Sequence, residues 1–202
     1  MKQYDVVIIG TGSGNIILDA ALSQGLQCAL IEKGRFGGTC LTRGCIPTKI
    51  MATAADYIRE IDELPKIGVD VAPAQMNWKV VSQRVWQKID ESKDILASYQ
   101  AADNLDIYQG TGYFTGEKFL QVTMNDGTIS EEFTADKIFI AVGARPNVPF
   151  IDGLEEAGYL TSETLFGEKY PDQPFKSLIV LGGGPIGTEF AHVFASAGSK
   201  VT

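Results

Sequence analysis

The chain has 202 residues, of which 45% are hydrophobic and 21% charged, and it carries a net charge of −8. The length predicts one complete domain and part of another, and the composition excludes a largely disordered chain. The acidic balance and the lack of a polybasic run argue against nucleic acid or an anionic membrane as the main partner. Neither a membrane span nor a secretory signal is predicted, because the first apolar run covers only residues 6–9.

The chain has 3 cysteines, too few for a disulfide scaffold at this length. We therefore expect a cytoplasmic protein whose cysteines, if functional, are catalytic or redox-active. Glycine is in excess, with 22 of 202 residues, about 11% against a typical level of about 7%. We therefore expect many positions of the fold at which only a residue without a side chain fits.

The first predicted unit is a strand at residues 4–9, a glycine turn at 10–15, a helix at 16–24 and a second strand at 27–32. This order defines a βαβ unit. Helices are then predicted at residues 47–64 and 78–99, and short strands at 105–108, 113–114, 119–124, 128–133 and 137–142, with a hairpin turn at Asn125-Asp126-Gly127. Residues 146–174 are rich in Pro, Gly and acidic side chains, which indicates a connector between domains.

The opening pattern then repeats as a strand at 177–181, a glycine turn at 182–187, a helix at 188–197 and a new strand from Ser199. Because the chain stops inside that strand, we expect the sequence to be part of a longer protein.

The first glycine turn has the pattern Gly10-x-Gly12-x-x-Asn15, after a strand and before a helix. Gly10 permits a tight turn, Gly12 lets a pyrophosphate approach the backbone, and the helix N-terminus favours the negative charge. Glu32 lies 20 residues after Gly12, where a carboxylate can bind ribose hydroxyls. The alternative is a packed turn without a ligand, and Asn15 in place of the third glycine weakens the match. The expected contacts here are Gly10, Gly12, Ser13, Gly14, Glu32 and Lys33.

Two cysteines, Cys40 and Cys45, lie five positions apart in Gly-Gly-Thr-Cys-x4-Cys-Ile-Pro-Thr-Lys, just before a Pro in a predicted first helical turn. A thiolate at a helix N-terminus is stabilised by the dipole and by unpaired N–H groups. Such a close pair can form a strained, easily reduced disulfide. A zinc site needs about four ligands. Besides this pair the chain offers only Cys28 and His192, so we expect no metal. A structural bridge over so short a loop would constrain little.

A complete second fingerprint, Gly182-x-Gly184-x-x-Gly187-x-Glu189, follows the strand at 177–181. It favours a second dinucleotide site, and the alternative is a second packed turn. His192 is expected to be a packed or half-exposed helix residue, and Cys28 an inert buried thiol.

With these motifs in this order, the whole chain resembles the flavin-dependent pyridine nucleotide–disulfide oxidoreductases with a Cys-x4-Cys active site. These include dihydrolipoamide dehydrogenase and the glutathione, mycothione and mercuric reductases. The motifs are the two fingerprints, the cysteine block and Ala141-Val142-Gly143-x-x-Pro146. Thr42 and Arg43 depart from the Asn-Val often seen between the two cysteines.

The resemblance implies that the first unit binds FAD and the second NAD(H) or NADP(H). It implies that Cys40 is the interchange thiol and Cys45 the charge-transfer thiol beneath the flavin. Lys49 would lie near the flavin N5 and pair with Glu189. Further contacts implied with the cofactors are Gly38, Thr39, Gly112, Ala141, Val142, Gly143, Gly182, Gly184, Pro185, Ile186 and Gly187. The acid–base His–Glu pair of the family has no match among these residues.

The expected fold is α/β. A doubly wound Rossmann-like FAD domain with an inserted antiparallel hairpin covers residues 1–149, and the start of a second Rossmann-like NAD(P)-binding domain covers 150–202. The expected function is two-electron transfer between nicotinamide, FAD and the Cys40–Cys45 disulfide, most similar to dihydrolipoamide dehydrogenase. Mycothione, glutathione and mercuric reductases are the alternatives, and a flavin-binding redox sensor without turnover is an alternative of another class. The expected partners are a small disulfide or dithiol, or a lipoyl protein, and a second copy of the chain.

Overall fold

The computed structural model describes residues 1–202, which divide into two compact units. Unit 1 comprises Met1–Thr42 and Asp90–Arg145, and unit 2 comprises Arg43–Ile89 and Pro146–Thr202. None of the helices combines the length and the apolar character that crossing a membrane requires.

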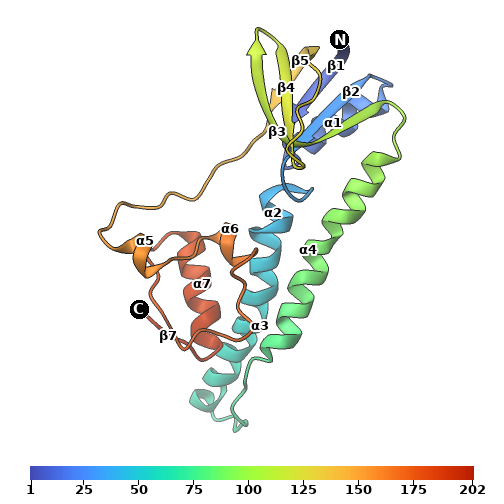
Figure 1. The fold of residues 1–202 in the computed structure, drawn as a ribbon. Helices are drawn as coiled ribbons and strands as arrows, with labels where there is room; N and C mark the ends of the chain where they lie inside the picture. Colours follow the sequence, from blue (N-terminus) through green and yellow to red (C-terminus); the bar gives the residue numbers. More distant parts are fainter. The chain divides into compact units, whose positions relative to one another are not determined.

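Unit 1 is built on a parallel sheet in the order β3, β2, β1, β5 (Figure 1). The fifth strand, β4, is antiparallel to β3 and to the start of β5. Helix α1 contacts β1 and β2, which completes the βαβ unit predicted for the start of the chain. The elements are β1 (Lys2–Ile9), α1 (Gly14–Ser23), β2 (Cys28–Glu32), α2 (Gly38–Thr42), β3 (Leu105–Gly116), β4 (Phe119–Met124) and β5 (Phe133–Ile140).

The central strands are buried on both faces, which explains their nearly continuous apolar sequences. One face of the sheet packs against residues of β4, with Val7, Ala29 and Leu120 all fully buried. The other face packs against α1, with Ile8, Leu18 and Leu30 fully buried. Both clusters hold the carboxyl ends of β1 and β2 in place, and the first glycine turn follows β1.

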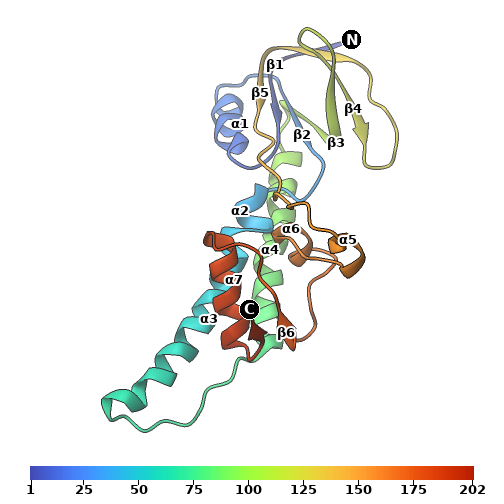
Figure 2. The same cartoon turned by 90° about the vertical axis from the view of Figure 1, so that its left-hand side faces the viewer.

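Unit 2 is mainly helical and contains α3 (Cys45–Glu63) and α7 (Pro185–Ser196), which lie side by side (Figure 2). Its other elements are η1 (Leu64–Ile67), α5 (Leu154–Ala157), α6 (Ser162–Leu165), β6 (Ser177–Leu178) and β7 (Lys200–Val201). Helix α4 (Trp78–Gln100) contributes its first half to unit 2 and its second half to unit 1. Strands β6 and β7 are parallel and flank α7 in sequence, so the repeat predicted near the end of the chain is confirmed.

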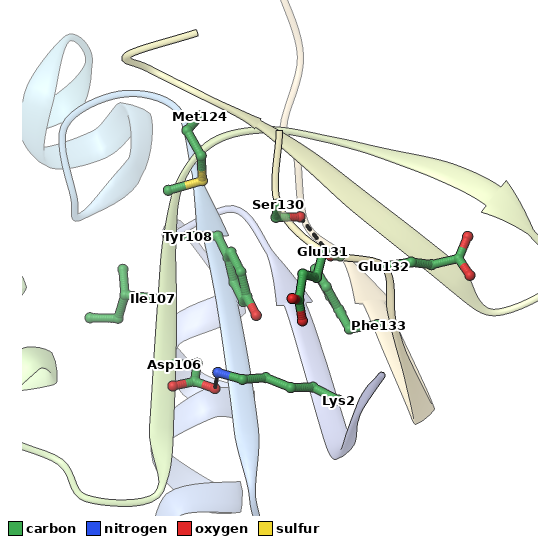
Figure 3. Close-up of a pocket in the computed structure, with 9 residues that line it drawn as sticks. All are labelled: Lys2, Asp106, Ile107, Tyr108, Met124, Ser130, Glu131, Glu132 and Phe133. Carbon is green, nitrogen blue, oxygen red and sulfur yellow. Dashed lines mark hydrogen bonds and ion pairs between the residues drawn. The ribbon is translucent and has the colours of Figure 1, made fainter. Parts of the chain in front are cut away.

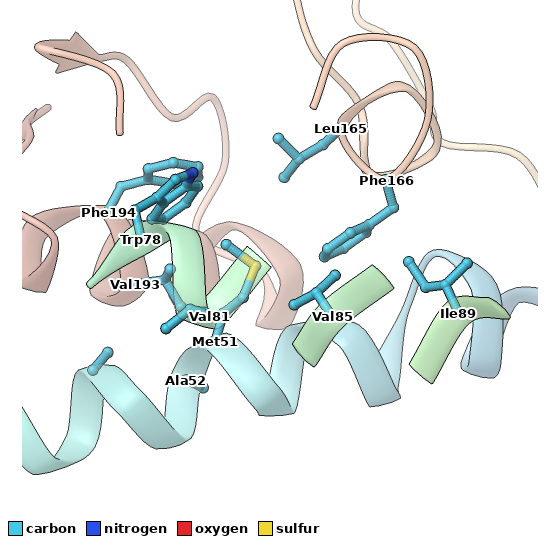
Figure 4. Close-up of a cluster of buried hydrophobic side chains, with 11 residues drawn as sticks. Met51, Ala52, Trp78, Val81, Val85, Ile89, Leu165, Phe166, Val193 and Phe194 are labelled. Carbon is cyan, nitrogen blue, oxygen red and sulfur yellow. The ribbon is translucent and has the colours of Figure 1, made fainter. Parts of the chain in front are cut away.

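The core of unit 2 gathers side chains from α3, α4, α6 and α7 (Figure 4). Met51 of α3, Val85 and Ile89 of α4 and Val193 of α7 are fully buried there. The apolar positions Val81, Val85 and Ile89 of the helix predicted at 78–99 pack in this core. The helix predicted at 47–64 also forms, but it buries Met51, Ala52 and Ala55, whereas Tyr57 is 63% exposed.

The predicted strand at residues 128–133 is wrong. Asn125-Asp126-Gly127 does form a turn, since the Gly127 amide donates to the Met124 carbonyl at 2.9 Å. Beyond it, however, residues 128–132 form no strand: Ile129 makes an isolated bridge to Thr123, and Phe133 is already the first residue of β5. The hydroxyl of Ser130 accepts a hydrogen bond from the Val122 amide, so a side chain takes a donor of β4. The connector at 146–174 also differs from expectation, because it contains α5 and α6.

The aromatic cluster around Phe133 gives a test of the core of unit 1. The Phe133 ring is 1% exposed, stacks on Tyr108 at 4.8 Å between centroids and meets Tyr4 edge-on at 5.6 Å. Phe133→Ala should lower the free energy of unfolding by about 3–5 kcal/mol in chemical denaturation. Phe114→Ala on β3, where the ring is 49% exposed, is the matched control and should cost clearly less. Equal losses in the two variants would contradict this description of the core.

Candidate functional site

The first glycine turn is closely packed in unit 1. Gly10 has φ +102°, and a Cβ there would lie 2.3 Å from the Ala141 carbonyl oxygen. A Cβ on Gly14 would lie 2.7 Å from the Ile8 side chain. Only glycine fits these two positions, so the turn brings the N-terminus of α1 directly onto the ends of β1 and β5.

Glu32 is bound into this turn. Its Oε2 accepts hydrogen bonds from the Thr11 amide at 2.9 Å and the Thr11 hydroxyl at 2.7 Å, and its Oε1 accepts one from the Gly34 amide at 2.8 Å. A carboxylate has about four acceptor positions, so capacity for ribose hydroxyls remains. Thr11 is a residue that the sequence interpretation missed, although its place between two fingerprint glycines was a possible signal.

The cysteine block lies directly on the same turn. A Cβ on Gly38 would lie 2.4 Å from the Cα of Gly12, and Gly38 has φ +66°. The Gly37 amide also donates to the Thr11 hydroxyl at 3.2 Å. This backbone contact places the start of α2, which carries Thr39 and Cys40, against the fingerprint turn.

The other residues predicted for the first cofactor lie around the carboxyl ends of the strands. Ala141 follows β5, and its amide donates to the Ile9 carbonyl at 2.8 Å, so the segment 141–143 borders the turn. Gly112 lies in β3 against the side chain of Ile31. Lys33 is exposed, and its carbonyl accepts a hydrogen bond from Asn125 at 3.2 Å.

These residues fit a dinucleotide. Ser13 is the N-cap residue of α1, but its side chain makes no capping hydrogen bond. The first-turn N–H groups of a helix have no partner within the helix, and here an anion can take that place. The side-chain oxygen of Asn15 is buried without a hydrogen-bond partner, which also marks an incomplete polar site. A pyrophosphate at this turn would be held by the backbone of residues 10–14 and the ribose by Glu32.

In unit 2, Cys45 is the first residue of α3, after the N-cap Gly44. Cys40 and Cys45 are both exposed, whereas Cys28 is buried. Burial, together with the nearby charge of Asp5, raises the pKa of the Cys28 thiol. The burial of Cys28 agrees with the prediction that it is an inert thiol, and Cys40 and Cys45 are accessible.

Helices α3 and α7 carry an ion pair and a hydrogen bond across their contact. Lys49 Nζ lies 2.5 Å from Glu189 Oε1, and the hydrogen bond and charge of Glu189 raise the pKa of Lys49. The structure thus brings together the lysine and glutamate that the resemblance pairs. His192 Nε2 lies 2.8 Å from Asp56 Oδ1, a hydrogen bond that the sequence interpretation missed. The helical spacing of Lys49 to Asp56 and of Glu189 to His192 could have indicated it.

The second glycine turn leads into α7. Gly182 has φ +107°, and a Cβ on Gly187 would lie 2.3 Å from its carbonyl oxygen. Gly184 is the N-cap residue of α7, and Pro185 and Ile186 begin the helix. No atom lies within 4 Å of a Cβ built on Gly184, so this side of the turn is open.

A separate cavity of about 390 Å³ lies in unit 1, between Lys2, Tyr108 and Phe133 (Figure 3). Lys2 and Phe133 stand at the first residues of β1 and β5, the opposite ends of those strands from the glycine turn. Ligands of open α/β sheets bind at the carboxyl ends of the strands. The cavity is therefore not the dinucleotide site, and Lys2 closes part of it by pairing with Asp106 at 2.9 Å.

The family described as "Pyridine nucleotide-disulphide oxidoreductase" matches residues 4–202. The chain belongs to this family. Members of this family depend on FAD and use NAD(P)H.

Among curated relatives of the chain, a mycothione reductase of Mycobacterium tuberculosis is 36% identical, over 100% of this chain and 43% of the relative. A dihydrolipoyl dehydrogenase of Bacillus subtilis is 34% identical, over 99% of this chain and 43% of the relative. A solved structure of the HOCl-induced flavoprotein disulfide reductase RclA from Escherichia coli is 30% identical, with a TM-score of 0.79 over 98% of this chain and 41% of that one. The chain thus spans about two-fifths of these proteins, and the Rossmann-like α/β fold is confirmed.

The contact between Gly12 and Gly38 can be tested in the flavoprotein. Gly38→Ala should weaken FAD binding about tenfold or more, because a left-handed non-glycine residue costs about 1–3 kcal/mol and the new Cβ would collide with Gly12. Gly116→Ala is the matched control, since its Cβ would meet only the Phe119 ring at 3.4 Å. Flavin absorbance per protein, followed during dialysis, reports the difference. Equal retention by the two variants would contradict a tight contact at this turn.

Proposed function

We propose that the protein is an FAD-dependent NAD(P)H:disulfide oxidoreductase in which Cys40 and Cys45 form the redox disulfide. The observation that carries the proposal is the backbone contact of Gly38 with Gly12, because it joins the cysteine block to a dinucleotide turn. In this proposal residues 1–149 form the FAD-binding segment and residues 150–202 begin the NAD(P)-binding domain. By resemblance, the intact protein acts as a cytoplasmic homodimer.

When bound, FAD supplies hydride transfer between a nicotinamide and a disulfide. Addition of a hydride equivalent to the Cys40–Cys45 bond breaks it and leaves one thiol and one thiolate, so that charge and atoms balance. By resemblance, Cys45 is the thiol that faces the flavin, and it begins the 19-residue helix α3, so its sulfur lies at the positive end of the helix dipole.

Cys40 is the thiol that exchanges with the substrate. It is exposed on the short helix α2. Cys40 attacks a substrate disulfide and its proton passes to the sulfur that leaves, so that a mixed disulfide and one substrate thiol are formed. Attack of the Cys45 thiolate on that mixed disulfide then restores the Cys40–Cys45 bond and releases the second substrate sulfur as a thiolate, which takes a proton from water. Lys49, paired with Glu189, supplies a fixed positive charge one turn after Cys45 on α3.

Anaerobic reduction tests the redox role. Addition of NADH or NADPH to the intact flavoprotein should produce a long-wavelength absorption band from a thiolate beside the flavin. Cys45→Ser should abolish this band because it removes the thiolate. Cys28→Ala is the matched control and should retain the band, since Cys28 is a buried thiol in strand β2, outside the cysteine block. Absence of the band in the unaltered protein, without reduction of a disulfide, would favour a redox sensor without turnover.

The substrate class is proposed as dihydrolipoamide or a lipoyl protein, and low-molecular-weight disulfides such as mycothione disulfide are the second candidate. The 34% identity to a dihydrolipoyl dehydrogenase supports the first, and the 36% identity to a mycothione reductase supports the second. We expect kcat/KM for dihydrolipoamide to exceed that for mycothione and glutathione disulfides by about tenfold, which is about 1.4 kcal/mol of transition-state binding. Steady-state rates with each substrate measure this order, and a reversed order would assign the protein to the reductases.

A further inference from the structure

Thr11 stands between Gly10 and Gly12 in the first glycine turn, and the proposed function gives its side chain no role. Its hydroxyl donates a hydrogen bond to Glu32 Oε2 at 2.7 Å and accepts one from the Gly37 amide at 3.2 Å. An amide N–H can only donate and an ionised carboxylate can only accept, so the hydroxyl proton points toward Glu32. Thr11 is 1% exposed, so water does not compete for either bond.

The hydrogen bonds around Glu32 hold both oxygens of its carboxylate. Oε2 accepts from the Thr11 amide at 2.9 Å as well as from the Thr11 hydroxyl, and Oε1 accepts from the Gly34 amide at 2.8 Å. A carboxylate has about four acceptor positions, of which Thr11 takes the two on Oε2. About one acceptor position therefore remains, and it belongs to Oε1.

The Gly37 amide keeps the Thr11 hydroxyl in this orientation. Gly37 has φ +102°, and a Cβ there would lie 2.5 Å from the Leu41 side chain, so its backbone is held closely against α2. If the Thr11 hydroxyl turned away, this partly buried amide would lose its acceptor, which is unfavourable. The carboxylate is therefore held by a side chain that is itself held in place.

We propose that Thr11 is a positioning residue for the adenosine ribose of FAD, because it holds Oε2 of Glu32 and leaves Oε1 to accept from one ribose hydroxyl. The inference rests on the proposed function, since it requires FAD to bind at the first glycine turn. A mobile glutamate side chain would lose rotamer freedom when the cofactor binds. Here that freedom is already lost on folding, so the held carboxylate should bind the ribose more tightly.

Removal of the Thr11 hydroxyl should weaken FAD binding. Thr11→Val keeps the shape of the side chain and the backbone amide, and it should raise the Kd for FAD about tenfold. Thr11→Ser restores the hydroxyl and should stay within about threefold of the unaltered protein. Thr115→Val is the matched control, because the Thr115 hydroxyl also donates to a carboxylate at 2.7 Å, that of Glu132, but on an exposed part of β3. It should leave the Kd unchanged.

The readout that separates positioning from a structural role is the preference for the ribose hydroxyl. We would measure the Kd of the intact apoprotein for FAD and for analogues that lack the 2′- or the 3′-hydroxyl of the adenosine ribose, by the change in flavin fluorescence. The unaltered protein should bind FAD about tenfold more tightly than one of the two analogues, because Glu32 accepts from that hydroxyl. In Thr11→Val this preference should fall to about threefold or less, whereas Thr11→Ser and Thr115→Val should keep it.

Chemical denaturation of each apoprotein shows whether the variants fold, and Thr11→Ala replaces Thr11→Val if the latter does not. Equal weakening of FAD and both analogues by the loss of the hydroxyl would mean a merely structural role and would overturn the inference. An unchanged Kd in Thr11→Val, or no preference in the unaltered protein, would overturn it as well. In these cases FAD still binds and the proposed function stands. If the unaltered apoprotein binds no FAD, the proposed function is wrong and the inference with it.

Discussion

The contact between Gly12 and Gly38 is the constraint on which the arrangement of unit 1 depends. Two backbones approach so closely that a Cβ on Gly38 would lie 2.4 Å from the Cα of its neighbour. The contact fixes the start of α2 on a turn whose own form requires Gly10 and Gly14. The start of α2, which carries Cys40, and the glycine turn thereby become parts of one substructure, and it rests on the buried strands β1 and β2.

In unit 2, side-chain packing and polar contacts, rather than a close backbone contact, hold the elements together. Its core of apolar side chains packs α7 on α3, and two polar contacts cross this interface, the ion pair of Lys49 with Glu189 and the hydrogen bond of His192 with Asp56. Surface ion pairs contribute little to stability, typically about 0–1 kcal/mol. Here these contacts serve to align the two helices, because they fix which turn of α7 lies against which turn of α3. The helix that begins with Cys45 is thus aligned with the helix that follows the second glycine turn.

The sequence predicted those parts of the fold that depend on local pattern. The strands and helices were predicted from the spacing of apolar residues, as in β1 and β2 and in the helices at 47–64 and 78–99. The turns at 10–15 and 182–187 were predicted from glycines, which adopt backbone conformations that other residues rarely accept. The strand at 128–133 was wrong, because its apolar spacing gave no sign that the Ser130 hydroxyl would take a backbone donor of β4. Likewise, the pairs of Arg43 with Glu163 and of His192 with Asp56 join residues more than 100 positions apart, and their geometry exists only after the helices have packed.

The central claim is that the glycine turn at residues 10–15 and the cysteine-bearing helix α2 form one cofactor-binding substructure. A crystal structure of the intact protein with FAD bound tests it most directly. The pyrophosphate should be held by backbone N–H groups of this turn, with the Gly38 backbone still in contact with Gly12. A pyrophosphate bound elsewhere, or a helix α2 separated from the turn in the bound protein, would contradict the claim.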